Sequence, residues 1–404
     1  MKQERNFPAV FVTKKQEHTI RHGHPWIYAD EITEQPDEIK NGSFVDVFGH
    51  RHNYLGTGFW SQHSQIRIRL LGNNANETYD DAFFERKVRY ALQYRKDVMG
   101  KEDFQACRLI HGESDGLPGL TVDRYNDILV SEVESYGTDL HKDVIYHALI
   151  SQLEDMGEHI SGIYERNEGA LREKEGLEQY KGWYGEKHPS SCVTRISENG
   201  ILYDVDVENG QKTGFFLDQK YNRRAVAKLA RGRTVLDCCT HTGSFALNAA
   251  KGGAKSVLAM DISDTALQMA AKNADLNHLN LSFRQGDVFE VLNDLKKEHA
   301  FFDFIILDPP AFTKSRKTYH NARKGYREIN SEAMRLLPRG GYLATASCSH
   351  FMPKEQFEKM LTDAAEDAGV SIRIIEQRGA APDHPVMPAI PETEYLKFFL
   401  LQVI

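Results

Sequence analysis

The sequence lacks several features that would assign it to common protein classes. No run approaches the roughly 20 apolar residues that a membrane-spanning helix needs, and the N-terminus has no apolar stretch of signal-peptide type. The five cysteines form no CxxC pair, so neither a zinc ribbon nor a disulfide framework is supported. A net charge of −8 argues against general affinity for nucleic acid, which comes from neutralising phosphates with Lys and Arg. We therefore expect a cytoplasmic protein with reduced thiols, no bound metal, and RNA contacts confined to local basic patches.

Composition shifts divide the 404 residues into three segments. Residues 1–72 contain short strand candidates between Gly- and Asn-containing turns, which is typical of a small β-rich module. After a polar linker, residues 76–190 combine helical periodicity at 81–99 and near 139–153 with a strand near 128–133, so we predict a central α/β domain. The predicted strands of the first segment are residues 10–12, 44–48, 54–59 and 66–71.

The third segment, residues 191–404, begins with a predicted hairpin and continues with alternating strands and helices. The pair Asn199-Gly200 indicates a type I′ turn, because Asn and Gly both accept positive φ angles. The alternation that follows predicts a doubly wound, Rossmann-like α/β sheet that is mainly parallel and has helices on both faces. Its predicted strands are 235–238, 256–260, 281–284, 304–307 and 342–346, and its first helices are 245–250, 264–277 (capped by Ser263) and 288–297.

Acidic residues stand at the ends of four of these strands, where ligands bind in open α/β sheets. Asp237 precedes Gly243, which would allow a tight turn near a ligand, and the spacing to Asp261 suits hydrogen bonds from ribose hydroxyls. Asp287 would bind an adenine amino group, and Asp308 ends the fourth strand. The GxGxxG fingerprint of dinucleotide sites is missing, so S-adenosylmethionine, with ribose and adenine but no phosphate, fits better. For any single aspartate, a helix-capping or solvated role is about equally expected.

Two segments carry reactive groups at strand ends. Asp308-Pro309-Pro310 follows the apolar run 304–307, and Ser347-Cys348-Ser349-His350 follows 342–346. A carboxylate and a thiol at one edge of a sheet favour chemistry on a flat heterocycle. A buried Cys is usually a small apolar side chain, but the position of Cys348 after a strand, in phase with Asp308, favours a nucleophile.

A basic segment with two tyrosines follows Phe312. Charge for phosphates and rings for base stacking are what a single-stranded RNA groove needs, although charge runs usually form a solvated surface. Because the segment adjoins Asp308, we favour RNA binding. The predicted RNA-binding residues are Lys314, Arg316, Lys317, Arg323, Lys324 and Arg327.

Over its whole length the chain resembles the RlmI-type family of bacterial 23S rRNA cytosine-5 methyltransferases. The resemblance rests on Asn209-Gly210-Gln211-Lys212-Thr213-Gly214-Phe215-Phe216-Leu217-Asp218-Gln219, Thr242-Gly243-Ser244-Phe245, Asp308-Pro309-Pro310-Ala311-Phe312, Ser347-Cys348-Ser349-His350 and Asp383-His384-Pro385-Val386, and also on residues 112–123. It implies an RNA-binding PUA domain at 1–72, a central α/β domain at 76–190, and a class I methyltransferase domain with a seven-stranded, mainly parallel sheet and a preceding hairpin at 191–404.

The resemblance also implies roles for individual residues. Cys348 would add to C6 of cytosine as a thiolate, and Asp308 would bind N3 and the 4-amino group. Relatives that methylate guanine nitrogens have asparagines and a lysine in place of Ser-Cys-Ser. The residues implied to bind S-adenosylmethionine are Lys212, Thr213, Gly214, Phe216, Asp218, Gln219, Asp237, Thr242, Gly243, Ser244, Phe245, Asp261, Ile262, Asp287, Val288 and Asp308.

Two departures from related patterns bear on the mechanism. Asp237 is followed by two cysteines instead of a glycine-rich turn, which we expect to change the shape of the loop more than its role. Many RNA cytosine-5 methyltransferases have a second cysteine where Ala311 stands. The base that removes the C5 proton is therefore open between His350, His384 and a water.

Two other functions stay open at this point. One is an RNA N-methyltransferase that acts on a purine amine, in which Cys348 only packs. The other is a non-catalytic RNA-binding ribosome assembly factor. Because the target base must leave its stack, the expected substrate is naked or partly assembled 23S rRNA. The sequence does not determine which nucleotide is the target. It also leaves the oligomeric state open between a monomer and a homodimer.

Overall fold

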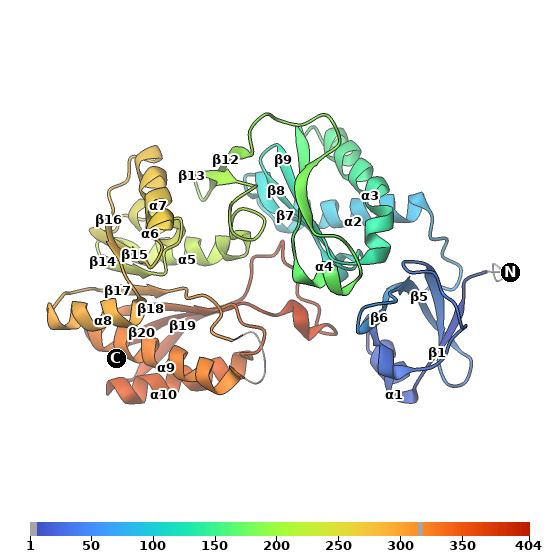
Figure 1. The fold of residues 1–404 in the computed structure, drawn as a ribbon. Helices are drawn as coiled ribbons and strands as arrows, with labels where there is room; N and C mark the ends of the chain where they lie inside the picture. The colour runs from blue at the N-terminus through green and yellow to red at the C-terminus, as the bar shows by residue number, and fades with distance from the viewer. Residues whose placement is uncertain (1–5, 314–317) are drawn as a thin grey trace. The chain divides into compact units, whose positions relative to one another are not determined.

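The computed structural model describes residues 6–313 and 318–404 (Figure 1). The chain forms two compact units. The first unit consists of Met1–Ile196, Asp204–Leu217 and Pro382–Thr393, and the second of Ser197–Tyr203, Asp218–Ala381 and Glu394–Ile404. Within the described ranges, no helix combines the length and the apolar character needed to cross a membrane.

A six-stranded sheet opens the first unit, in the order β2-β6-β5-β4-β1-β3. Its core consists of alternating apolar residues such as Val10, Val12, Val45 and Val47, all fully buried. The four strands predicted here are confirmed, but helix α1 (Lys14–Arg21) and two short strands were not predicted. The strands are β1 (Ala9–Val12), β2 (Trp26–Tyr28), β3 (Ile32–Glu34), β4 (Phe44–Phe48), β5 (Tyr54–Trp60) and β6 (Ile66–Gly72).

A five-stranded sheet, in the order β11-β10-β9-β8-β7, forms the rest of this unit with helices α2 (Asp81–Val98), α3 (Tyr136–Asp155) and α4 (Ala170–Lys174). Helices α2 and α3 lie side by side on one face of the sheet (Figure 1). The sequence predicted only one of these strands. They are β7 (Ala106–His111), β8 (Leu120–Tyr125), β9 (Ile128–Val133), β10 (Gly162–Asn167) and β11 (Tyr180–Tyr184).

The second unit contains a seven-stranded sheet in the order β16-β15-β14-β17-β18-β20-β19. Strands β14 to β18 are parallel, and β20 runs antiparallel to β18 and β19. This confirms the doubly wound, mainly parallel sheet. The strands are β14 (Thr234–Cys238), β15 (Ser256–Asp261), β16 (Ser282–Gln285), β17 (Phe304–Leu307), β18 (Tyr342–Ser347), β19 (Ile372–Arg378) and β20 (Lys397–Val403).

Helices cover both faces of this sheet (Figure 1). Apolar residues of α8, α9 and α10 pack on one face, and those of α5 and α6 pack on the other. Ser263 caps α7 by accepting a hydrogen bond from Ala266 N at 3.2 Å, as predicted. The helices are α5 (Lys220–Ala230), α6 (Ser244–Lys251), α7 (Asp264–Leu276), α8 (Val288–Lys297), α9 (Tyr319–Leu336) and α10 (Lys354–Ala368).

The predicted hairpin consists of β12 (Val193–Glu198) and β13 (Ile201–Asp206). Asn199 and Gly200 have φ angles of 54° and 72°, so both central residues of the turn lie in the left-handed region. The type I′ turn is therefore confirmed.

Candidate active site

The predicted acids gather where the strand order of the seven-stranded sheet reverses. Strand β14 has β15 on one side and β17 on the other, so the ends of these three strands border the crevice in which such sheets bind ligands. Cys239, directly after β14, lies within the electrostatic influence of all four acids. Burial raises the pKa of its thiol, and the carboxylates of Asp261, Asp308, Asp237 and Asp287 raise it further. The second unit thus brings the four acids together around one point.

Asp237 has an unsatisfied oxygen in this crevice. Its Oδ2 accepts hydrogen bonds from Thr240 Oγ1 at 2.6 Å and Ala246 N at 2.9 Å. Its Oδ1 is buried and has no hydrogen-bond partner among the described residues, and the same holds for Thr242 Oγ1. Burial raises the pKa of Asp237 to about 7. Buried polar atoms are normally paired, so this pair of atoms fits the hydroxyl and amino groups of a bound cofactor.

The loop between β14 and α6 holds a strained backbone. Cys239, His241 and Gly243 have φ angles of 61°, 50° and 82°, a region that non-glycine residues rarely adopt. Asp261 Oδ2 accepts a hydrogen bond from His241 N at 2.8 Å, which ties the loop to the end of β15. Strain of this kind persists where the surrounding structure enforces it, and it is common at ligand sites. Ser244 and Phe245, both buried, begin the helix.

Asp287, the third acid, has the helix-capping role that the sequence also allowed. Asp287 caps α8, because its Oδ1 accepts a hydrogen bond from Phe289 N at 2.9 Å. Of the neighbouring predicted residues, Ile262 is 67% exposed and Val288 is buried. A contact of Asp287 with adenine stays a prediction.

Asp308 and Cys348 directly follow the adjacent parallel strands β17 and β18. Asp308 Oδ1 accepts a hydrogen bond from Gln219 Nε2 at 3.0 Å. The pKa of the Tyr326 hydroxyl, on α9, is influenced by both reactive groups. Burial raises its pKa to about 12, and the charges of Cys348 and Asp308 contribute to the rise. The carboxylate and the thiol therefore share a neighbour, as predicted for one crevice.

Sequence reasoning missed Lys397, the first residue of β20. This lysine is 3% exposed and donates hydrogen bonds to the carbonyl oxygens of Ser349 and Tyr395. Burial lowers its pKa to about 8. A lysine between Leu396 and Phe398, inside an apolar run, was the signal that could have revealed it.

Four residues implied to bind the cofactor belong to the first unit. Thr213 Oγ1 donates a hydrogen bond to Asp123 Oδ2 at 2.6 Å, and the Tyr125 hydroxyl lies 2.8 Å from Thr213 Oγ1. Lys212 Nζ lies 4.5 Å from the ring centre of Phe216. The fourth, Gly214, has a φ of 141°, which suits glycine. Their cofactor contacts stay predictions.

The predicted RNA-binding residues fall into two groups. Lys314, Arg316 and Lys317 lie outside the described residues. On α9, Arg323 pairs with Asp363 and Arg327 forms two hydrogen bonds of 2.6 Å with Asp367, both carboxylates belonging to α10. These two guanidinium groups thus help to join two helices, and Lys324 is exposed.

The two histidines considered as bases lie in different units. His350 is exposed and belongs to the second unit with Cys348. His384 belongs to the first unit, where its Nδ1 lies 2.9 Å from Asp383 Oδ1.

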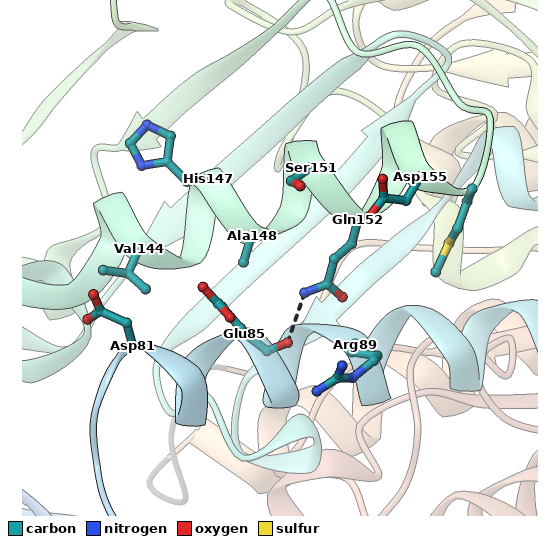
Figure 2. Close-up of a pocket in the computed structure, with 10 residues that line it drawn as sticks. Asp81, Glu85, Arg89, Val144, His147, Ala148, Ser151, Gln152 and Asp155 are labelled. Carbon is teal, nitrogen blue, oxygen red and sulfur yellow. Dashed lines mark hydrogen bonds between the residues drawn. The ribbon is translucent and has the colours of Figure 1, made fainter.

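A separate hollow of about 600 Å³ lies between α2 and α3 in the first unit (Figure 2). Its lining combines charged and polar residues such as Glu85, Arg89 and His147 with apolar residues such as Val144 and Met156. Gln152 Nε2 donates a hydrogen bond to the Glu85 carbonyl at 2.9 Å across it. None of the catalytic, cofactor-binding or RNA-binding residues predicted from the sequence lines this hollow.

Comparison with known proteins agrees with this architecture. A model of PUA-like domains matches residues 10–73, and a model of S-adenosylmethionine-dependent methyltransferases matches residues 183–400. Two solved structures of proposed methyltransferases, one complexed with SAH and one from Streptococcus mutans, share the fold with TM-scores of 0.82 and 0.80. Each is 22% identical, and each match covers 98% of this chain and 100% of the other.

The fold and the strand-end site thus define a class I methyltransferase that uses S-adenosylmethionine. Curated relatives named ribosomal RNA large subunit methyltransferase I are 42% identical in Pseudoalteromonas atlantica and 40% identical in Aeromonas salmonicida. The matches cover 96% of this chain and 98% and 97% of the respective relatives. The chain therefore belongs to the ribosomal RNA large subunit methyltransferase I family, and the resemblance noted in its motifs is confirmed.

Proposed function

We propose that this large-subunit rRNA methyltransferase acts on C5 of a cytosine in 23S rRNA through a covalent adduct between Cys348 and C6. The observation that carries the proposal is the placement of Asp308 and Cys348 after adjacent parallel strands, where both influence Tyr326. From the ends of adjacent strands, a carboxylate can hydrogen-bond to N3 and the 4-amino group of a pyrimidine while a thiol attacks C6 on the other side of the ring.

The chemistry requires a nucleophile because C5 of cytosine is too electron-poor to take a methyl group unaided. The Cys348 thiolate adds to C6, and the electrons of the C5–C6 double bond move onto the ring, where Asp308 supplies or stabilises a proton at N3. S-adenosylmethionine supplies the methyl group to C5. Loss of the C5 proton then restores the C5–C6 double bond, the C6–S bond breaks with its electron pair returning to sulfur, and the proton at N3 returns to Asp308.

The cofactor is proposed to lie over the strand ends of the second unit. Asp237 and Thr242 would accept or share its hydrogen bonds, which is supported by their unsatisfied buried oxygens. Asp261 would bind the ribose hydroxyls, and Asp218 and Gln219 would complete the part of the site that belongs to the second unit. In the same proposal, residues 1–72 act as the PUA-like RNA-binding domain, 76–190 as the central domain and 191–404 as the methyltransferase domain.

Nucleoside mass spectrometry of unmodified 23S rRNA tests this function. The RNA is incubated with S-adenosylmethionine and the wild-type protein, Cys348→Ala or Cys192→Ala, the last being a matched control because Cys192 lies in the first unit. We expect 5-methylcytidine with the wild type and Cys192→Ala, and none with Cys348→Ala. A methylated purine, or 5-methylcytidine from Cys348→Ala, would overturn the proposal and favour amine methylation or another nucleophile.

A further inference from the structure

A buried lysine lies next to the proposed nucleophile. Lys397 is 3% exposed and pairs with Ser347 across the antiparallel strands β20 and β18, so it stands opposite the residue that precedes Cys348. Lysines are almost never buried to this extent unless they are paired. The sheet itself brings Lys397 and Cys348 together, although they are far apart in the sequence.

Hydrogen bonds fix the Lys397 ammonium group in this place. Its Nζ donates to the carbonyl oxygen of Ser349, the residue that follows Cys348, and to that of Tyr395 at 2.7 Å. The cation is thus tied to the backbone beside the thiol. Carbonyl oxygens satisfy donors of the ammonium group, but they do not neutralise its charge.

Two groups near Lys397 could act as its counter-ion. Burial opposes its charge, while Cys348 and Glu394 favour it. Glu394 is exposed, so water screens its charge, and Cys348 is partly buried. Water therefore screens an anionic Cys348 sulfur less than it screens Glu394, and the sulfur would interact more strongly with Lys397.

Other titratable groups face the thiol from neighbouring elements. Asp308, after β17, carries a negative charge that disfavours a thiolate, and Tyr326, on α9, is buried and neutral because its pKa is raised to about 12. His350 follows on the same loop and is exposed. Within residues 6–313 and 318–404, Lys397 is a buried cation that can offset Asp308.

We propose that Lys397 is a positioning residue that holds Cys348 as a thiolate by forming an ion pair with it. The inference rests on the proposed role of Cys348 as nucleophile. The thiol proton of Cys348 is released to water as the pH rises, while Lys397 keeps its own proton and remains an ammonium group beside the thiolate. When sulfur adds to C6 its negative charge passes to the pyrimidine, and when the C6–S bond breaks the thiolate returns to the same ammonium group.

Alkylation of Cys348 in the whole protein, without RNA, tests the ion pair. Wild-type and Lys397→Met proteins are treated with iodoacetamide between pH 5 and 10, and the Cys348 peptide is quantified by mass spectrometry. Methionine keeps the length and apolar character of the side chain but removes the charge. We expect the midpoint of alkylation to rise by at least about one pH unit, which is roughly a tenfold slower reaction at neutral pH. Cys192 in the same samples is the internal control.

Lys397→Arg provides a second variant that keeps the charge, and SAH binding by each variant verifies that the methyltransferase unit is folded. We expect Lys397→Arg to retain a low alkylation midpoint. We also expect the methylation defect of Lys397→Met to shrink as the pH rises, which a purely structural defect would not do. Equal midpoints in the wild type and Lys397→Met would overturn the inference while leaving the proposed function intact. Formation of 5-methylcytidine by Cys348→Ala would overturn the function, whatever the alkylation shows.

Discussion

The buried carboxylate of Asp237 should destabilise the cofactor-free protein as the pH rises. Its side chain is 0% exposed, and burial raises its pKa from 3.8 to about 7. Below pH 3.8 the group is protonated in both folded and unfolded chains, so it has no effect. Between pH 3.8 and 7 the unfolded chain releases a proton that the folded chain retains, and stability falls. Above pH 7 the full penalty, about 4 kcal/mol at 1.36 kcal/mol per unit, is constant.

The substitution Asp237→Asn removes this titration. Its amide NH₂ would replace an oxygen that has no partner among the described residues, which costs about 1–3 kcal/mol at every pH. That cost cancels when the variant is compared with the wild type at two pH values. The free energy of unfolding of the wild type should fall by about 3 kcal/mol between pH 5 and pH 8, because two pKa units separate pH 5 from the midpoint at about 7. The variant lacks this loss, so its stability relative to the wild type should rise by the same amount over that range.

Hydrogen exchange of peptides from β14 and β17, followed by mass spectrometry, is the suitable assay. The three tryptophans, Trp26, Trp60 and Trp183, all belong to the first unit, so fluorescence would follow the other unit and serves as the control. The slowest amides of a core strand report its opening free energy. A stability difference between variant and wild type that is the same at both pH values would refute the reasoning. SAH affinity should fall in the variant.

Three further substitutions test other parts of the structure. Glu198→Gln should lower the free energy of unfolding in urea by about 3–5 kcal/mol, because the buried Arg223, 1% exposed and 2.6 Å away, loses the negative charge of Glu198. Adding Arg223→Met should restore most of the lost stability. Tyr125→Phe should lower the free energy of unfolding of the first unit by about 1–3 kcal/mol in urea, because its buried hydroxyl accepts a hydrogen bond from Phe215 N at 3.0 Å and lies 2.8 Å from Thr213 Oγ1, while the exposed Tyr90→Phe should change it little. Gly243→Ala, at a φ of 82°, should lose about 1–2 kcal/mol in thermal unfolding; an unchanged midpoint there would contradict the assigned strain.

The sequence alone determined the elements whose signals are local. Apolar period and turn residues placed β17 at 304–307 and α8 at 288–297 with the bounds found in the structure. Ser263 and Asn199-Gly200 specify a cap and a turn through their own side chains and φ preferences, so they also could be predicted. The acids at the strand ends followed from these strands, because parallel strands deliver their carboxyl ends to one edge.

Only the tertiary structure decided which partner each side chain meets. Arg323 and Arg327 pair with carboxylates of α10, although their residue types equally suited RNA phosphates. Lys397 reaches the backbone around Cys348 because β20 returns antiparallel to β18 after α10 and β19. A local pattern encodes periodicity and capping, whereas such a contact depends on strand order and register across many intervening residues. That non-local pairing is why the sequence led to the prediction of Cys348 as a nucleophile but did not point to Lys397 near it.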